Sequence, residues 1–339
     1  MPLNIFKRKS KISPLPLFDE AFLRRMERLS YRTAPALRGG MVGERRSRNL
    51  RPALDFSDHR PYVSGDDLRH VDWYAYARHK DLFVKLGEAT QRIDLHLLLD
   101  ASRSMGWQPS DHFRTAAEAN AGQLLASKWD MARRMAGALS YLGLASGERV
   151  KLTSFAASLE DGFGPVQGKR QVMPVLDYLS QLAPSLLGGV TDEVSGLATS
   201  LAAYARANPK GGLLLIISDL LDTAVDAAGQ AGEAEILAAG LRHLPAPRWQ
   251  VLVMHLLTQQ ELQPTLSGDF DLEDIETEES LPFRVDEPTL AQYRLRVRRW
   301  CATLQSACAR RGATYSQILA EWPLEQKVIP YLRQRGLFQ

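Results

Sequence analysis

The sequence is poor in cysteine, with two among its 339 residues. Cys301 and Cys308 are seven positions apart in a helical pattern, or about 10 Å along the helix axis, which is too far for a disulfide. A disulfide-stabilised secreted fold is therefore excluded. We expect two core thiols in a protein that works in a reducing compartment.

Long apolar runs are also missing. No run approaches the ~20 residues that a membrane-spanning helix needs. The segment Met1 to Lys11 carries basic residues without the apolar stretch that completes a signal peptide. These two features favour a cytoplasmic location.

The chain has little net charge, formally +3, which does not suggest a nucleic-acid partner. Basic residues outnumber acidic ones about three to one from Met1 to Arg51, and acidic residues dominate 269–279. We interpret both segments as solvated surface. Trp73, Tyr74 and Tyr76 could stack on bases, but aromatic residues in an arm more often pack on a core, so we expect no nucleic-acid binding.

Strand-like and helix-like segments alternate through the middle of the chain. Short apolar runs predict strands, and apolar residues spaced every three or four positions predict amphipathic helices. This alternation predicts an α/β fold with an open, mainly parallel, doubly wound sheet and helices on both faces. The predicted strands are 93–99, 150–155, 213–217 and 251–257, and the predicted helices are 129–144, 192–207 (with Thr191 as N-cap) and 233–244.

The two ends of the chain extend this plan. An acidic loop or hairpin is predicted near 259–288, followed by a final helix–strand–helix unit over 289–336, in which Pro330 should kink or split the last helix. The N-terminal third shows a short helix over 18–29, a strand over 81–86 and otherwise little periodicity. We therefore predict two parts, an N-terminal basic arm or small subdomain over 1–91 and an α/β domain over 92–339.

One polar segment follows a predicted strand at once. Asp100, Ser102 and Ser104 come directly after the apolar run Leu97-Leu98-Leu99, where open α/β sheets bind ligands. Carboxylate and hydroxyl oxygens suit a hard cation such as Mg²⁺, Ca²⁺ or Mn²⁺.

Two further oxygen-bearing residues follow elements of the same sheet. Thr191 opens a predicted helix, and Asp219 ends the strand 213–217 through Ser218. Parallel neighbouring strands would bring them to the edge that carries Asp100. The sequence thus predicts a divalent metal site made by Asp100, Ser102, Ser104, Thr191 and Asp219. The alternative is that these side chains only cap strand ends and turns.

This set of residues resembles the metal-ion-dependent adhesion site of von Willebrand factor type A domains, and it implies that Rossmann-like fold. The resemblance implies direct metal contacts from Ser102, Ser104 and Thr191, with Asp100 and Asp219 often acting through water. In such domains an acidic side chain of the partner protein completes the coordination of the metal, and the domain itself catalyses no reaction.

A second resemblance covers nearly the whole chain after about residue 17. Several segments, together with Arg335-Gly336-Leu337 at the end, are similar to the bacterial domain of unknown function 58 family. That family is commonly paired with MoxR-type AAA+ ATPases in the assembly or activation of other proteins, which implies such an ATPase and an acidic client segment as partners. The segments are Gly43-Glu44-Arg45-Arg46-Ser47-Arg48, Asp55-Phe56, Arg60-Pro61-Tyr62, Gly65-Asp66-Asp67-Leu68-Arg69-His70-Val71-Asp72-Trp73, Ala77-Arg78 and Leu82-Phe83-Val84-Lys85.

Trp107 to Ser127 is longer than expected between the Asp100 loop and the first helix, and we expect it either to lengthen that helix or to cover the site.

The acidic residues of the N-terminal region allow two interpretations. We favour an ion-pair network that locks the arm onto the core; the alternative is a metal-dependent hydrolase that uses Asp66, Asp67 and Asp72. The network would contain Arg60, Asp66, Asp67, Arg69, Asp72 and Arg78.

Overall fold

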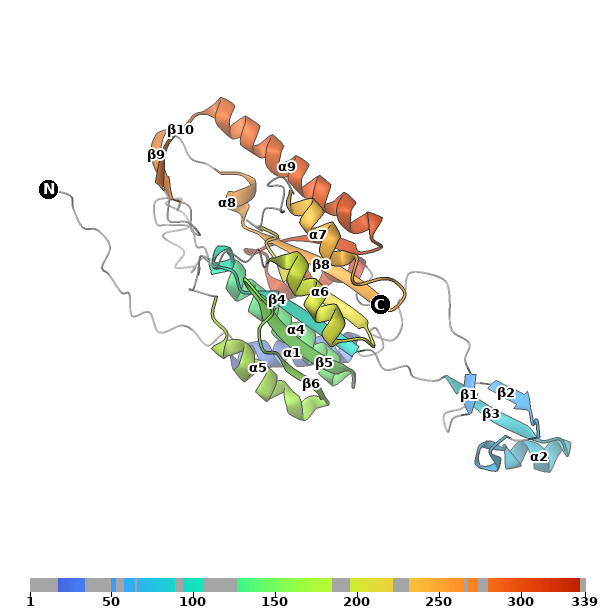
Figure 1. Cartoon of the computed structure of the whole chain (residues 1–339). Helices are drawn as coiled ribbons and strands as arrows, with labels where there is room; N and C mark the ends of the chain where they lie inside the picture. Colours follow the sequence, from blue (N-terminus) through green and yellow to red (C-terminus); the bar gives the residue numbers. More distant parts are fainter. Residues whose placement is uncertain are drawn as a thin grey trace.

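A computed structural model gives the fold of the chain. It describes residues 18–33, 50–52, 58–64, 66–88, 94–106, 127–184, 196–221, 232–264, 268–273 and 280–335. Its main feature is a six-stranded sheet with the strand order β11-β8-β7-β4-β5-β6 (Figure 1). In that order the strands are Thr314–Leu319, Trp249–Leu257, Gly212–Ser218, Asp94–Asp100, Arg149–Phe155 and Phe163–Gln167.

Five strands are parallel, and only the edge strand β6 runs antiparallel to its neighbour β5. The central strands are buried on both faces, which explains their nearly continuous apolar sequences. Along β4, Leu97 and Leu99 enter one core while Leu98 enters the other, because successive side chains of a strand point to opposite faces.

Helices cover both faces of the sheet. Residues of the first group of helices, α1, α4, α5 and α10, share one core cluster with β4, and residues of α6, α7 and α9 share the other. The predicted mainly parallel α/β sheet with helices on both sides is confirmed. The first group spans Glu20–Thr33, Lys128–Ala145, Val172–Gln181 and Ile329–Gln334, and the second spans Leu197–Ala207, Glu233–Leu241 and Glu287–Arg310.

One predicted helix start is wrong. Helix α6 begins at Leu197 rather than Asp192, and its N-cap is Gly196 rather than Thr191. Gly196 has an extended backbone, and its N–H donates to Thr199 Oγ1 at 3.0 Å, which satisfies a group at the helix end. Gly196 falls inside the predicted helix, where glycine is unfavourable, and the observed helix begins directly after it. Thr191 itself lies outside the described residues.

Within the α/β core, strand β6 and helix α5 have no counterpart among the predictions. Strand β6 contains Gly164 and Pro165, which favour a turn, and it tolerates proline because it lies at the edge of the sheet. Helix α5 contains Pro174 in its first turn, where the missing N–H would have had no partner within the helix.

The C-terminal predictions are confirmed more closely. The acidic stretch forms an antiparallel hairpin of β9 (Gly268–Glu273) and β10 (Ser280–Val285), beyond the short helix α8 (Gln259–Leu262). The last helix is split as Pro330 predicted, into a π-helical turn over Leu324–Val328 and α10. Both cysteines are free, with Cys308 buried and Cys301 half-buried.

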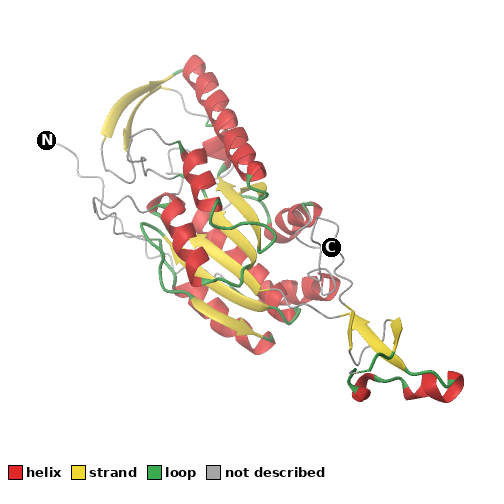
Figure 2. Ribbon diagram, turned by 45° about the vertical axis from the view of Figure 1, so that its right-hand side comes forward, coloured by secondary structure: helices red, strands yellow, loops and turns green. Residues whose placement is uncertain are grey.

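The N-terminal third forms a separate three-stranded antiparallel sheet in the order β1-β3-β2, with helix α2 (Trp73–His79). We call it the small sheet. In Figures 1 and 2 it lies to one side of the central sheet. Its strands are Leu50–Pro52, Phe83–Glu88 and Asp58–Pro61 in that order.

Helix α1 does not belong to the small sheet, although it precedes it in the chain. It packs against α4, and its Phe22 and Met26 are buried in the core. The predicted arm over 1–91 thus supplies one helix of the α/β core as well as the small sheet. The predicted boundary near residue 91 lies between β3 and β4, outside the described residues.

Candidate functional site

The candidate site lies at the carboxyl ends of β4 and β7. These strands are parallel neighbours, with Leu99 level with Ile217, so Asp100 and Ser218 reach the sheet edge side by side. Ser218 Oγ donates to Asp100 Oδ2 at 2.5 Å, and Asp219 follows as the next residue. The parallel pairing therefore brings Asp100 and Asp219 together, as the sequence predicted.

The loop after β4 turns back over this edge as a short 3₁₀ turn, Arg103–Gly106. Ser102 N–H donates to Asp100 Oδ1 at 2.9 Å, and the hydroxyl oxygens of Ser102 and Ser104 lie 3.0 Å apart. Ser104 is buried and Ser102 is half-buried. Asp100, Ser102 and Ser104 thus form one hydrogen-bonded group, in which Ser102 is the residue that reaches solvent.

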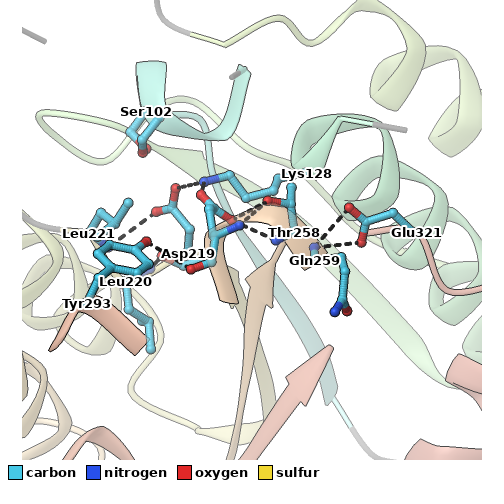
Figure 3. A network of polar contacts seen from close by, with 12 residues as sticks. Ser102, Lys128, Asp219, Leu220, Leu221, Thr258, Gln259, Tyr293 and Glu321 are labelled. Carbon is cyan, nitrogen blue, oxygen red and sulfur yellow. Dashed lines mark hydrogen bonds and ion pairs between the residues drawn. The ribbon is translucent and has the colours of Figure 1, made fainter. Parts of the chain in front are cut away.

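Asp219 has a partner that the sequence did not suggest. Lys128, the first residue of α4, donates from Nζ to Asp219 Oδ2 at 2.8 Å and to Glu261 Oε1 at 2.6 Å. Lys128 and Asp219 are both fully buried. Figure 3 draws this network, with Ser102, Lys128, Asp219 and Thr258 labelled.

Glu261 is fixed by the start of helix α8, directly after β8. Thr258 is the N-cap, and its Oγ1 accepts from Glu261 N–H at 3.1 Å. In return Glu261 Oε2 accepts from Thr258 N–H at 2.6 Å, which is the reciprocal arrangement of a capping box. This leaves Oε1 of Glu261 for Lys128.

Charge at the site is unbalanced. Burial, and then the nearby carboxylate of Asp219, raise the pKa of Asp100 to about 7, although Ser218 and Ser102 donate hydrogen bonds to it. Burial alone would lower the pKa of Lys128, but the carboxylates of Asp219 and Glu261 outweigh burial and raise it, so its ammonium stays charged. Lys128 thus pairs with Asp219 and Glu261 but not with Asp100, and further positive charge would stabilise Asp100 as a carboxylate.

The backbone after β7 is strained. Leu220 is buried and has a φ of 56°, a left-handed conformation that a bulky side chain seldom adopts. Leu220 N–H donates to Ser218 Oγ at 2.8 Å, and Leu221 N–H donates to Asp219 Oδ1 at 3.3 Å. Such strain concentrates at functional sites, because the surrounding structure must hold it in place.

The donor set fits a divalent ion on one side of the site. Neighbouring oxygens of an octahedral Mg²⁺ with bonds near 2.1 Å are about 3 Å apart, which matches the 3.0 Å between Ser102 Oγ and Ser104 Oγ. The buried Asp100 carboxylate beside them supplies charge. On the other side Asp219 Oδ2 already accepts from Lys128. In the described part of the chain, no three His, Cys, Asp or Glu side chains form a group that could hold a metal ion.

Two parts of the predicted site lie outside the residues that the structure describes. Thr191, the remaining predicted ligand, lies outside the described residues. So do all but the last residue of the segment 107–127, which we expected to lengthen the helix or to cover the site. Ser127 is described, and it is the N-cap of α4, accepting from Asp130 N–H at 3.0 Å.

The predicted ion-pair network forms within the small sheet and its helix. Arg60 pairs with Asp66 at 2.8 Å, and Arg69 pairs with Asp67 at 2.6 Å. Asp72 contacts His59 Nε2 at 2.8 Å and caps α2. Among the ion pairs of the described residues, none of these residues reaches the α/β core. Each of these pairs joins residues that lie close together in the same unit. That the network locks the arm onto the core stays a prediction.

Arg78 lies in the last turn of α2, where a cation stabilises the helix dipole. It takes part in no ion pair among the described residues. Of the quoted family segments, Gly43 to Arg48, Asp55-Phe56, Gly65 and Gly336-Leu337 lie outside those residues.

The sequence analysis missed Lys128, Glu261 and Ser218. One signal could have pointed to Lys128: a lysine in the first turn of a helix opposes the helix dipole, so it needs nearby anions to compensate. Ser218 lies next to Asp219 in the chain, but only the pairing of β4 with β7 shows that it donates to Asp100.

Together, the sheet and this edge define an α/β protein with a buried, charged and hydroxyl-lined site at the carboxyl ends of its central strands. The family model described as "Protein of unknown function DUF58" matches residues 58–302. The match covers more than half of the sequence, and the chain belongs to this family.

Two curated relatives are the uncharacterized proteins Rv1480 of Mycobacterium tuberculosis and Mb1516 of Mycobacterium bovis. Each is 25% identical to this chain over 239 residues. The matched region is 69% of this chain and 65% of each relative, so the chain spans just under two thirds of their length.

Two solved structures are similar in backbone. The conserved hypothetical protein BatB from Bacteroides thetaiotaomicron matches with a TM-score of 0.38 and 14% identity, over 71% of this chain and 98% of that one. An aerotolerance-related membrane protein from Bacteroides fragilis matches with a TM-score of 0.39 and 16% identity, over 72% and 98%. Among the described helices of this chain, none is long and apolar enough to cross a bilayer.

Proposed function

We propose that this protein is a non-enzymatic binding module that grips a partner protein through a divalent metal, with a von Willebrand factor type A-like domain as its core. The observation that carries the proposal is the hydroxyl pair of Ser102 and Ser104, 3.0 Å apart beside the buried Asp100. When bound there, Mg²⁺ or a similar ion would offer an open position to an acidic side chain of the partner.

The residues of this chain would hold and orient such an ion. Asp100 is fixed by hydrogen bonds from Ser218 Oγ and Ser102 N–H, so it cannot turn away from the serines. Ser102 is half-buried, which leaves one side of the pair accessible. Thr191 is proposed as the further ligand from the adhesion-site pattern.

We take the partner to be a MoxR-type AAA+ ATPase, with the chain acting as an adaptor between that ATPase and an acidic segment of a client protein in the cytoplasm. The family pairing motivates this assignment. The free thiols Cys301 and Cys308 suit a reducing compartment.

The carboxylates of the small sheet favour this proposal over the metal-dependent hydrolase. Val63 N–H, and then Arg60, lower the pKa of Asp66, which is the opposite of what a general acid requires. Asp72 is occupied as the cap of α2, through Tyr74 N–H and Ala75 N–H. Hydrogen bonds and ion pairs that fold the small sheet thus account for these residues.

The test measures binding of the full chain to a purified MoxR-type ATPase from the same cell, with Mg²⁺ or with a chelator. We expect Ser102→Ala and Asp100→Ala to weaken binding at least about tenfold, since each removes an oxygen from the site. The matched control is Ser306→Ala, which removes an exposed serine hydroxyl of α9 and should change nothing. Binding that is equally tight in the chelator would rule out the metal-dependent grip.

A further inference from the structure

Lys128 is an unusual residue to find inside this protein. Its side chain is fully buried, and its only polar atom donates to two carboxylates, Asp219 at 2.8 Å and Glu261 at 2.6 Å. Removing a lysine ammonium from water costs several kcal/mol unless charged partners compensate, and here two do so. The ammonium of Lys128 thus lies at the edge of the sheet where the sequence pattern predicts a metal ion.

The position of Lys128 bears directly on the predicted ligands. Asp219 Oδ2 faces the ammonium, and Asp219 Oδ1 accepts from Leu221 N–H at 3.3 Å. Both oxygens are therefore engaged by the protein. Asp100, Ser102 and Ser104 instead hydrogen-bond with one another and with Ser218, and no ammonium reaches them in the described residues. Among the described residues, the ammonium of Lys128 thus hydrogen-bonds to Asp219 and not to Asp100, Ser102 or Ser104.

We propose that Lys128 is a built-in cation that holds the Asp219 carboxylate in place of a metal ion. A divalent metal can then contact Asp100, Ser102 and Ser104 but not Asp219. It binds more weakly than it would if Asp219 were also available as a ligand. This inference rests on the proposed function, since it concerns how the same site selects and holds its metal.

The network also explains how Lys128 stays in place. It is the first residue of α4, directly after the N-cap Ser127, so its backbone is fixed. Glu261 is held by the capping box with Thr258, and Tyr293 Oη on α9 donates to Glu261 O at 2.8 Å. A rigid lysine held from two helices cannot readily move aside for an incoming ion.

The main test is a double-mutant cycle read out by calorimetric titration of the full chain with MgCl₂. Lys128→Met should tighten Mg²⁺ binding at least about tenfold, because it frees the Asp219 carboxylate and removes a repelling charge. In the Asp219→Asn background the same change should give a clearly smaller gain, because no carboxylate is freed. Equal gains in the two backgrounds would overturn the proposal. The control is Lys210→Met, which replaces an exposed lysine at the amino ends of the strands and should have no effect.

A second measurement covers the case in which Lys128→Met does not fold. Asp219→Asn preserves shape and leaves Lys128 paired with Glu261. In a melting experiment we expect this variant to keep a Mg²⁺-dependent rise in Tm, whereas the double variant Ser102→Ala, Ser104→Ala loses it. If Asp219→Asn loses the rise as fully as the serine variant, the metal uses Asp219 and the proposal is wrong.

The outcomes separate this inference from the proposed function. If Lys128→Met binds Mg²⁺ and the wild-type chain does not, Lys128 excludes the metal, and the proposed metal-dependent binding of the partner is wrong. If the wild-type chain binds Mg²⁺ and Asp219→Asn abolishes binding, the grip stands and the role of Lys128 fails. If no variant binds Mg²⁺, both are wrong.

Discussion

At the scale of single residues, burial decides the chemistry of the charged and titratable groups. His96 on β4 and His255 on β8 are both buried, and each contacts a tyrosine hydroxyl through Nδ1, at 2.9 Å and 2.6 Å. Burial lowers the pKa of each histidine to about 4. Tyr315 thus satisfies His255 Nδ1, whereas the buried Nε2 has no hydrogen-bond partner among the described residues.

His96 should make the protein sensitive to mild acid. Its pKa is about 4 in the folded state against 6.5 for the free side chain, so the unfolded chain takes up the proton first as the pH falls. Stability contributed by neutral His96 is therefore present above pH 6.5 and is lost as the pH falls toward 4, by about 2 kcal/mol between pH 7 and pH 5. Urea denaturation at both values should show a smaller loss for His96→Gln than for wild type. An equal loss in both proteins would contradict this origin of the acid sensitivity.

At the scale of elements, packing decides where a segment belongs more than its place in the chain does. Helix α1 precedes the small sheet, yet its Phe22 and Met26 lie in the α/β core. Phe18, just before the helix, packs against α4. Gly137 of α4 makes this close approach possible: a Cβ there would lie 2.5 Å from Phe18 Cε1. A small residue on α4 and an aromatic ring just before α1 thus fix the contact.

We expect Met26→Ala to destabilise the whole α/β core, not only its N-terminal end. The side chain is fully buried, so its loss leaves a cavity and should reduce the free energy of unfolding by about 2–5 kcal/mol. Arg24→Ala on the same helix is the control; that side chain is exposed and should cost less than about 0.5 kcal/mol. Chemical denaturation measures both, and an unchanged value for Met26→Ala would show that α1 adds nothing to the core.

At the scale of the whole molecule, two folded units carry separate sets of interactions. The ion pairs of the small sheet, such as Arg60 with Asp66, lie within it. The buried charges of the central sheet, Lys128 with Asp219 and Glu261, lie within the α/β core. We therefore expect damage to one unit to stay largely within that unit.

Asp72→Ala tests this separation. The substitution removes the N-cap of α2, which accepts from Tyr74 N–H and Ala75 N–H, and should cost about 1–2 kcal/mol locally. Hydrogen exchange should show faster exchange in α2 and unchanged protection in β4 and β7. Asp81→Ala, at an exposed position of the same unit, should leave both regions unchanged. Loss of protection in β7 as well would show that the units are coupled.

The sequence by itself determined the alternation of strands and helices, and the placing of Asp100 and Asp219 at strand ends, because apolar periodicity and strand length are local properties. The strand predicted inside the helix–strand–helix unit over 289–336 forms as β11, Thr314–Leu319. Only the tertiary structure decided that Ser218 donates to Asp100 and that Lys128 meets Asp219 and Glu261, since these contacts join residues 91 to 133 positions apart. A parallel sheet brings distant segments to one edge, and which side chains meet there depends on strand order and helix position, which no local pattern contains.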